Sequence, residues 1–286
     1  MNREKGRFRA FPHHPTLLVT KEHRRFAEFC DACRRSRYIG ICYGAPGVGK
    51  TMSARHYARW DLIDPLIESF FKLDSVGNRM RLPEEIAECR TIFYTAPISG
   101  TPGRIERETN HLRNRLNWMF NEAIRQHDDT VEDRMLWEDD PDRIELIIVD
   151  EADRAKPAGL EQLRDTYDRS GVGLILVGMR GLEKQMSRYP QLYSRVGFVH
   201  EFRPLSREEI NFILEHKWRE LGTTLDPTDF TDTEAVTSII RITGGNFRLI
   251  HRLCLQIERL MQINEIRTIS KELVEAARES LVIGTA

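Results

Sequence analysis

The amino-acid sequence predicts an α/β fold, with a parallel, doubly wound sheet flanked by helices and a small all-helical region at the C-terminal end. Three observations carry this prediction. Apolar runs of strand length alternate with helix-compatible segments up to residue 202, which is the pattern of repeated βαβ units. Two of these runs end in a glycine-rich turn and in a pair of carboxylates, as expected at the carboxyl edge of a parallel sheet. From residue 206 onward the pattern changes to helices only.

Length and composition set the domain organisation that we expect. The chain has 286 residues, of which 40% are hydrophobic, so it can bury one large domain and a smaller one. Its first residues are basic and include Pro12 and Pro15, which oppose helix formation. We expect a basic N-terminal arm at 1–20, a core at 21–205 with an exposed acidic insertion at about 127–143, and a helical lid at 206–286.

The charge balance narrows the classes of partner. The formal net charge is −1, so no global basic field indicates nucleic acid, and any such surface must be local. No stretch is long and apolar enough to span a bilayer, and the first residues lack the hydrophobic segment of a secretory signal. We therefore expect a cytoplasmic protein without a membrane partner.

The cysteines do not indicate a disulfide framework, because five of them are scattered through a large chain. Cys30 and Cys33 form a C-x-x-C motif downstream of several histidines. No second C-x-x-C exists to complete a tetrahedral metal site. We expect both cysteines to lie with Phe26 and Phe29 on the apolar face of an amphipathic helix.

The elements of the first half follow from apolar periodicity and from the positions of Gly and Pro. A helix leads into the first strand, and a second helix follows the glycine-rich turn. An irregular stretch precedes the second strand, after which Pro97, Gly100, Pro102 and Gly103 mark a loop. We expect helices at 21–36, 52–60 and 105–126, strands at 38–43 and 91–95, and irregular chain at 61–90.

The second half begins with the acidic segment, which is too polar and unpatterned for a core element. Three further strands alternate with helical segments. A capping box then opens the lid, since Ser206 is followed three residues later by Glu209. We expect strands at 144–150, 173–177 and 197–202, a helix at 159–169, and three or four lid helices ending near residue 281.

The glycine-rich turn after the first strand has the complete pattern G-x-x-x-x-G-K-T. In this setting backbone N–H groups surround phosphate oxygens, and the following helix adds its positive dipole end. The lysine reaches the β- and γ-phosphates, and the threonine hydroxyl binds Mg²⁺. A Gly-rich surface turn is the alternative, which the strand before it and the helix after it oppose. We expect ATP to bind Gly44, Ala45, Pro46, Gly47, Val48, Gly49, Lys50 and Thr51.

The second motif is the strand at 144–150, which is almost entirely apolar and ends in Asp150 and Glu151. A strand of this kind is buried on both faces of a parallel sheet, so its carboxyl end opens onto the ligand crevice. We expect Asp150 to hold the Mg²⁺ ion, directly or through water, and Glu151 to polarise the water that attacks the γ-phosphate. A solvated acidic turn is the weaker alternative.

Together these features resemble the AAA+ ATPases, and more narrowly the transposition target-selection ATPases of the TnsC, TniB and MuB type. The resemblance covers nearly the whole chain. The phosphate loop and the acidic strand are typical of the superfamily, whereas the compact size, the segments 148–154 and 174–178 and the small lid are narrower signals. It implies a P-loop AAA+ ATPase that forms a ring or helical filament on double-stranded DNA, without sequence preference, and recruits a transposase and possibly a target-selector protein.

One position departs from the AAA+ pattern. In this family a polar residue just past the fourth strand helps to position the attacking water. Here that place is occupied by Gly178, Met179 and Arg180. The resemblance therefore implies hydrolysis that is slow or stimulated by a partner.

Two arginines take roles from the same resemblance. Arg195, just before the fifth strand, stands where such proteins place an arginine finger that reaches the γ-phosphate of the neighbouring subunit. Arg188 is the near alternative, and an ordinary surface arginine is equally compatible with either position. Arg248, after Gly244 and Gly245, matches the lid arginine that contacts the nucleotide in cis.

A DNA-binding surface is expected on the loop and helix after the second strand, which face the central channel in related ATPases. Basic and hydroxyl side chains on this loop and helix would bind phosphates without reading bases. A solvated helix face balanced by Glu106 and Glu108 is an equal alternative. The candidates are Thr101, Arg104 and Arg107, with Arg154 and Lys156 as a second patch, and Arg3, Lys5, Arg7 and Arg9 of the arm as the next choice.

Three function classes remain open at this point. The first is a nucleotide-switched DNA-binding adaptor that recruits a transposase. The second is a helicase loader or another AAA+ remodeller, which would share the ATP site and the assembly. The third is a small-molecule P-loop kinase, which Glu151 beside Asp150 and the helical lid oppose.

Overall fold

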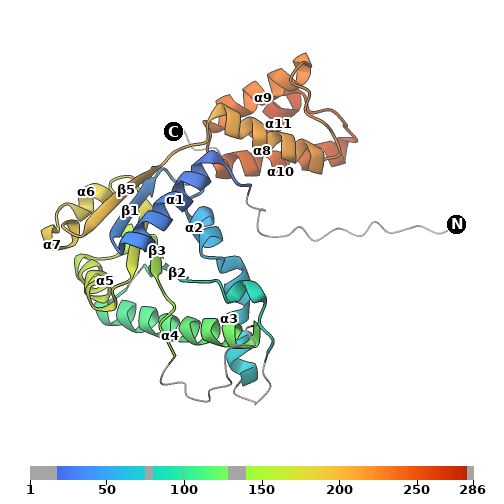
Figure 1. Cartoon of the computed structure of the whole chain (residues 1–286). Coiled ribbons are helices and arrows are strands. Elements are labelled where there is room, and N and C mark those ends of the chain that lie inside the picture. Colours follow the sequence, from blue (N-terminus) through green and yellow to red (C-terminus); the bar gives the residue numbers. More distant parts are fainter. Residues whose placement is uncertain (1–17, 75–79, 99, 128–139, 282–286) are drawn as a thin grey trace.

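The computed structural model of this chain describes residues 18–74, 80–98, 100–127 and 140–281. Its core is a single five-stranded sheet in the order β2-β3-β4-β1-β5, and every neighbouring pair is parallel. Figure 1 shows this sheet between its helices, with a separate group of helices formed by the C-terminal part. The predicted fold class is therefore confirmed. The strands are β1 (Ile39–Gly44), β2 (Thr91–Thr95), β3 (Leu146–Asp150), β4 (Gly173–Met179) and β5 (Val196–Phe202).

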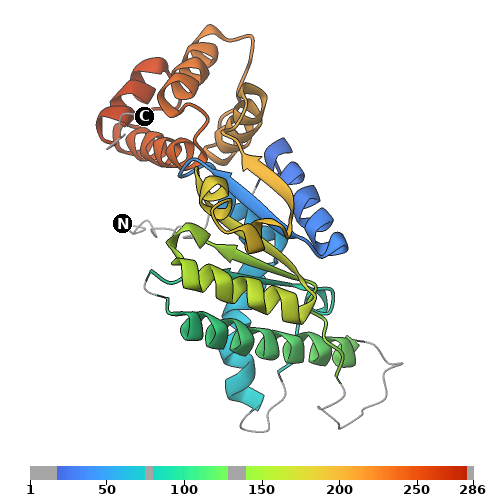
Figure 2. The ribbon, with the colours of Figure 1, turned by 90° about the vertical axis from the view of Figure 1, so that its left-hand side faces the viewer.

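Helices cover the sheet on both sides, with α1 on one side and α4 and α5 running next to each other on the other (Figure 2). None of the helices in the described part of the chain combines the length and apolar character needed to cross a membrane. The helices of the core are α1 (Lys21–Ser36), α2 (Lys50–Tyr57), α3 (Trp60–Asp74), η1 (Glu84–Ile86), α4 (Pro102–His127), η3 (Ala152–Arg154), α5 (Pro157–Ser170), α6 (Leu182–Met186) and α7 (Pro190–Tyr193).

The α1 helix packs as its sequence predicts. Phe26, Phe29, Cys30 and Cys33 are all buried at helical spacing, so the C-x-x-C motif belongs to the hydrophobic core. The helix approaches the sheet closely at Gly40 of β1, where an added Cβ would lie 2.5 Å from the sulfur of Cys33. Burial raises the pKa of the Cys33 thiol to about 12, so it stays protonated and packs as an apolar group.

The expectation of irregular chain at 61–90 is wrong over its first part, where α3 forms. Trp60, Ile63, Ile67 and Phe70 are buried at intervals of three and four residues, so they make one helical stripe. Pro65 lies inside this helix and costs about 3 kcal/mol relative to alanine. Each large apolar side chain contributes about 1.5–3 kcal/mol on burial, so four of them outweigh the proline.

Two other expected segments fall largely outside the described residues. The basic arm is described only from residue 18 onward, and the acidic insertion only at its ends. The C-terminal end of the insertion is tied to α4, because Asp140 pairs with Arg125 at 2.8 Å and Arg143 donates to the side chain of Asn121 at 3.0 Å. Charge pairing with α4 therefore orders residues that the sequence pattern placed in an exposed loop.

The C-terminal part is a four-helix unit with its own hydrophobic cluster, centred on Trp218, Ile213, Leu214 and Leu253. The capping box at Ser206 and Glu209 is present as predicted. Leu205, the last residue before the expected boundary, packs into this lid cluster, and Leu18 packs against it from the arm side. The lid helices are α8 (Arg207–Glu220), α9 (Phe230–Thr243), α10 (Phe247–Asn264) and α11 (Lys271–Glu279).

A buried pair of glutamates joins α1, the end of β5 and the lid. Glu209 accepts hydrogen bonds from the backbone N–H of Glu22 at 2.8 Å and of Ser206 at 2.9 Å. Glu22, only 2% exposed, accepts from the backbone N–H of Arg203 at 3.1 Å, and its carboxylate lies 3.2 Å from Nε2 of His200. The lid is therefore fixed to the core by charge-assisted bonds to main-chain donors.

Glu22→Gln should reduce stability at neutral pH by about 1–2 kcal/mol, because a charge-assisted acceptor becomes neutral. Burial alone would raise the pKa of Glu22, but the contacts with His200 and the Arg203 backbone outweigh it and lower this pKa below 4.5. A carboxyl pKa that is lower in the folded state gives stability above the unfolded pKa and loses it as pH falls through the folded pKa. Urea unfolding at neutral pH and below pH 4.5 should therefore show that the difference in free energy of unfolding between parent and variant decreases in acid.

The matched control is Glu28→Gln, since Glu28 is an exposed glutamate on the same helix. It should leave stability nearly unchanged at both pH values. A gap between parent and Glu22→Gln that stays constant as pH falls would contradict the assignment.

Candidate functional site

The glycine-rich loop connects the buried strand β1 to α2 and has the backbone of a phosphate cradle. Gly47 and Gly49 adopt positive φ values of 77° and 117°, which favour residues without a Cβ. Gly44, where the strand ends, lies so close to β5 that an added Cβ would be 2.4 Å from the carbonyl oxygen of Phe202. These glycines are fixed by geometry, and the backbone N–H groups at the start of α2 are available to an anion.

The charged side chains of the two motifs meet at this loop and are shielded from water. Lys50 is 8% exposed, and its Nζ donates to the carbonyl oxygens of Gly44 at 2.9 Å and Ala45 at 2.8 Å. Asp150 is 3% exposed, and its Oδ2 accepts from Oγ1 of Thr51 at 2.7 Å. A hydroxyl and a carboxylate oxygen at this separation are a donor set suited to Mg²⁺, which prefers oxygen ligands.

Burial shifts both charged groups toward their neutral forms. It lowers the pKa of the Lys50 ammonium, while the carboxylates of Asp150, Glu151 and Asp153 oppose that effect. It raises the pKa of Asp150, and the hydrogen bond from Thr51 opposes this shift. Both groups are therefore only partly solvated. A bound phosphate and a bound cation would supply the missing interactions.

Glu151 follows directly in a left-handed backbone conformation, with φ of 55°. Its backbone N–H donates to Oδ1 of Asp150 at 2.9 Å. Its side chain is half-exposed and lies 3.4 Å from the guanidinium of Arg154. The two motif carboxylates thus differ, since Asp150 is buried beside Thr51 whereas Glu151 is accessible to water, as a general base must be.

The lid contacts the glycine-rich loop directly through the start of α10. The side chain of Asn246 donates to the carbonyl oxygen of Pro46 at 2.8 Å and caps the helix by accepting from the N–H of Leu249. The backbone N–H of Arg248 donates to the carbonyl oxygen of Gly47 at 2.9 Å. The Arg248 side chain is exposed at this contact. The expected nearness of Arg248 to the phosphate loop is present, whereas the part of Asn246 in holding the loop was not foreseen.

Arg195 lies at the amino ends of the strands, opposite the end that carries the glycine-rich loop. Its carbonyl oxygen accepts from the N–H of Ile39 at 3.1 Å, where β1 begins, whereas the glycine-rich loop follows the end of β1. Its Nε donates to Oδ1 of Asp168 on α5 at 2.6 Å, and its Nη1 donates to the carbonyl oxygen of Gln191. Arg188, the alternative finger, is exposed.

The two candidate basic patches lie next to each other at the amino ends of α4 and α5. An added Cβ at Gly159 of α5 would lie 2.8 Å from Cδ1 of Ile105 on α4, so the first turns of the helices touch. Arg107 and Lys156 are exposed there. The residues of both patches are exposed near this contact, and we name them together the α4–α5 basic edge: Thr101, Arg104, Arg107, Arg154 and Lys156.

Part of this basic edge is paired within the chain. Arg104 forms an ion pair with Glu108 at 2.7 Å, as the alternative of a balanced helix face implied. Thr101 caps α4, because its Oγ1 accepts from the N–H of Arg104 at 3.3 Å. Solvent screens this exposed pair, so it does not prevent Arg104 from turning toward a phosphate.

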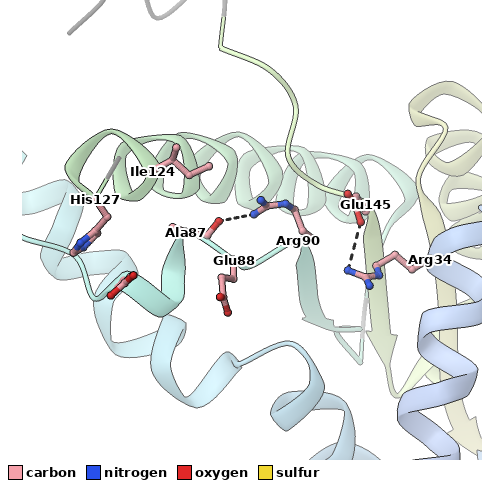
Figure 3. A pocket seen from close by; sticks show the side chains of 8 residues that line it. Arg34, Ala87, Glu88, Arg90, Ile124, His127 and Glu145 are labelled. Carbon is pink, nitrogen blue, oxygen red and sulfur yellow. Dashed lines mark hydrogen bonds and ion pairs between the residues drawn. The ribbon is translucent and has the colours of Figure 1, made fainter. Parts of the chain in front are cut away.

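A pocket of about 470 Å³ lies away from the phosphate loop, at the amino ends of β2 and β3 (Figure 3). Its cations are already engaged, since Arg34 lies 3.5 Å from Glu145 and Arg90 donates to the carbonyl oxygen of Ala87 at 2.7 Å. Ligands of open parallel sheets bind at the carboxyl ends of the strands. This pocket is therefore separate from the candidate nucleotide site. Its lining is Arg34, Glu84, Ala87, Glu88, Arg90, Ile124, His127 and Glu145.

Comparison with known families agrees with this geometry. The model of the AAA domain family matches residues 33–186, which span β1 to β4 with both motifs. The chain belongs to the AAA domain family. As an AAA domain it has the P-loop fold of nucleoside triphosphatases, and ATP binding follows from the loop and its buried lysine.

Individual proteins with similar sequences or structures extend the match. The chain is 47% identical over 273 residues to a potential ATP-binding protein of Staphylococcus aureus, covering 94% of this chain and 97% of the relative. It is 24% identical over 251 residues to the Mu-like prophage FluMu DNA transposition protein B of Haemophilus influenzae, covering 85% and 72%. The Thermotoga maritima RuvB Holliday junction branch migration motor has the same fold, with a TM-score of 0.56, 15% identity, and coverage of 93% and 70%.

Lys50→Ala should lower ATP affinity by about 100-fold, because it removes a charged hydrogen-bond donor worth about 3 kcal/mol to the phosphates. It should also lower the melting temperature, because the carbonyl oxygens of Gly44 and Ala45 lose a donor and the buried Asp150 loses a nearby cation. Titration with a fluorescent ATP analogue and thermal unfolding without nucleotide measure the two effects.

Lys156→Ala serves as the control, because Lys156 is an exposed lysine at the same edge of the sheet. It should bind ATP like the parent. Parent-like affinity in Lys50→Ala would mean that the nucleotide binds elsewhere.

Proposed function

We propose that this AAA domain protein is an ATP-dependent, DNA-binding regulator of DNA transposition, which assembles on target DNA and recruits or activates a transposase. The observation that carries the proposal is the similarity to a DNA transposition protein B over 85% of the chain. The α4–α5 basic edge, on a chain of net charge −1, provides the local surface that DNA requires.

Hydrolysis of ATP is assigned to the residues at the glycine-rich loop. Lys50 neutralises charge on the phosphates, and Thr51 and Asp150 would hold Mg²⁺, which supplies further neutralisation of the phosphate oxygens. Glu151 polarises the attacking water and takes its proton. Arg248 stabilises the same nucleotide from the lid, where its backbone already contacts the loop.

Arg195 is assigned to the site of a neighbouring subunit. It stands at the amino end of β5, whereas Phe202 at the carboxyl end pairs with Gly44 of the loop. Seven strand residues at about 3.3 Å each separate the two ends by roughly 20 Å, which an arginine side chain cannot span. A role for Arg195 at the γ-phosphate therefore requires a second copy of the chain, and the protein acts as a homo-oligomer.

Mixing Arg195→Ala protein with Lys50→Ala protein should restore part of the ATPase activity that each variant lacks alone. Some interfaces in the mixture join an intact pocket to an intact finger, and a finger contributes about 10³–10⁵-fold in rate in known cases. Steady-state phosphate release at several mixing ratios gives the measurement.

Arg188→Ala replaces Arg195→Ala in the matched experiment and distinguishes the two candidate fingers. If activity is restored only in mixtures with Arg188→Ala, the finger role belongs to Arg188. Mixtures as inactive as either variant, under conditions where both oligomerise, would contradict a finger in trans.

DNA recognition is assigned to phosphate contacts. The amino ends of two adjacent helices present N–H groups and positive dipole ends, and Arg104, Arg107 and Lys156 add charge. Contacts of this kind carry no sequence information. One subunit offers few of them, so affinity depends on ATP-driven assembly that places many copies along one duplex.

Arg104→Glu should weaken binding to every duplex alike while ATP binding persists. Fluorescence anisotropy with two unrelated duplexes, with and without ATP, over a salt series measures this. Affinity should fall with salt at a slope of about −0.9 per neutralised phosphate. Arg219→Glu, at an exposed arginine of the lid, is the control and should bind DNA like the parent.

Binding that ignores salt, or a strong preference for one duplex, would contradict phosphate-based recognition. An Arg104→Glu variant that binds like the parent would remove the α4–α5 basic edge from the proposal. The transposition role itself is tested by sequencing the neighbouring genes and by co-purification with any transposase that they encode. Absence of such a gene, or failure to bind its product in the presence of ATP and DNA, would count against the role.

A further inference from the structure

The last two residues of β4, Gly178 and Met179, have no polar side chain, and the exposed Arg180 follows them. A carboxylate from another element covers this strand end. Gly178 has no side chain and Met179 is apolar and 37% exposed. Asp153, from the short helix η3 after β3, places its Oδ1 where it accepts the backbone N–H of Met179 at 3.1 Å. An added Cβ at Gly178 would lie 2.4 Å from that oxygen, so the glycine makes room for the carboxylate.

The position of this carboxylate follows from the order of the strands. β4 lies between β3, which carries Asp150, and β1, which carries the glycine-rich loop. In the register of the sheet, Met179 is paired with Gly44, the first residue of the loop. Asp153 therefore lies at the carboxyl edge of the sheet between the proposed magnesium ligand and the phosphate cradle.

The charge of Asp153 also acts on Lys50 of the glycine-rich loop. Burial lowers the pKa of Lys50, and Asp153 is one of the carboxylates that oppose this shift, together with Asp150 and Glu151. All three carboxylates therefore favour the charged form of Lys50. Asp150 is engaged with Thr51, and Glu151 is the proposed base, so Asp153 is the carboxylate with no role yet.

We propose that Asp153 positions the attacking water, a role for which the last two residues of β4 offer no polar side chain. This inference rests on the proposed ATPase activity. One carboxylate oxygen is fixed by the Met179 N–H, which leaves the other to accept a hydrogen bond from the water. The water oxygen attacks the γ-phosphorus, the bond from that phosphorus to the bridging oxygen breaks, and Glu151 takes the proton. Asp153 gains and loses no proton in this step, so it is a positioning residue.

Asp153→Ala should lower kcat by about 100-fold, the scale expected when a reacting group is misplaced by about an ångström. Its affinity for a non-hydrolysable ATP analogue should stay within about threefold of the parent. Its affinity for ADP with aluminium fluoride should fall, because that complex imitates the transferring phosphoryl group together with the attacking water. This second binding readout does not depend on turnover.

A rescue separates positioning from a structural role at the end of β4. Asp153→Ala combined with Met179→Asn should recover about tenfold in kcat, since a polar side chain then comes from β4 itself. Gly178→Ala should act like Asp153→Ala, because its methyl group displaces the carboxylate. The variant that combines Gly178→Ala with Asp153→Ala should be no slower than either single variant. Asp165→Ala, at a residue of α5 that pairs with Arg169 at 2.8 Å, is the control and should keep the parent kcat.

Three results would overturn the inference. Asp153→Ala with parent kcat, while Glu151→Gln is inactive, would leave the ATPase assignment intact and remove Asp153 from it. Asp153 would instead have only a structural role if Asp153→Ala is inactive but binds ADP–aluminium fluoride like the parent. The same conclusion follows if Met179→Asn does not restore its activity. A parent protein that hydrolyses no ATP with DNA present would instead refute the proposed function, and the inference with it.

Discussion

The rest of the structure depends on keeping a lysine and an aspartate out of water at one edge of a parallel sheet. Lys50 and Asp150 are nearly inaccessible, and isolated buried charges cost several kcal/mol each. The chain offsets this cost with main-chain carbonyls of the glycine-rich loop and with the Thr51 hydroxyl. The compensation is incomplete without a ligand, which is why phosphate and a divalent cation are the chemistry that this edge favours.

The lid is attached to this edge at two places, and both use hydrogen bonds to the main chain. The start of α10 holds carbonyl oxygens of the loop through Asn246 and the Arg248 backbone. The start of α8 is held to α1 and β5 by Glu209 and Glu22. Because the first contact is to the loop itself, any change in loop conformation on nucleotide binding would reach the lid without an intermediate element. Such a change would couple nucleotide state to the proposed subunit assembly.

The sheet also separates the parts of the proposed reaction in space. The carboxyl edge holds the nucleotide site and, beyond β2 and β3, the α4–α5 basic edge, whereas Arg195 stands at the amino edge. The proposed water-positioning carboxylate comes from the short helix after β3. Most groups of the proposed reaction therefore lie within a few residues of the ends of β1 and β3. In the proposed function the finger, Arg195, comes from another copy, which would link hydrolysis to assembly.

The sequence by itself determined the elements whose signals are local. The five strands, the glycine-rich loop, the capping box and the acidic strand end each depend on residues close together in the chain, and all were predicted. Tertiary structure alone decided contacts between distant segments, such as Asn246 with Pro46 and Glu22 with Glu209, because no local pattern encodes which surfaces meet. It also decided α3, where burial of an apolar stripe outweighs Pro65, and the place of Asp153, which depends on the space that Gly178 leaves on a neighbouring strand.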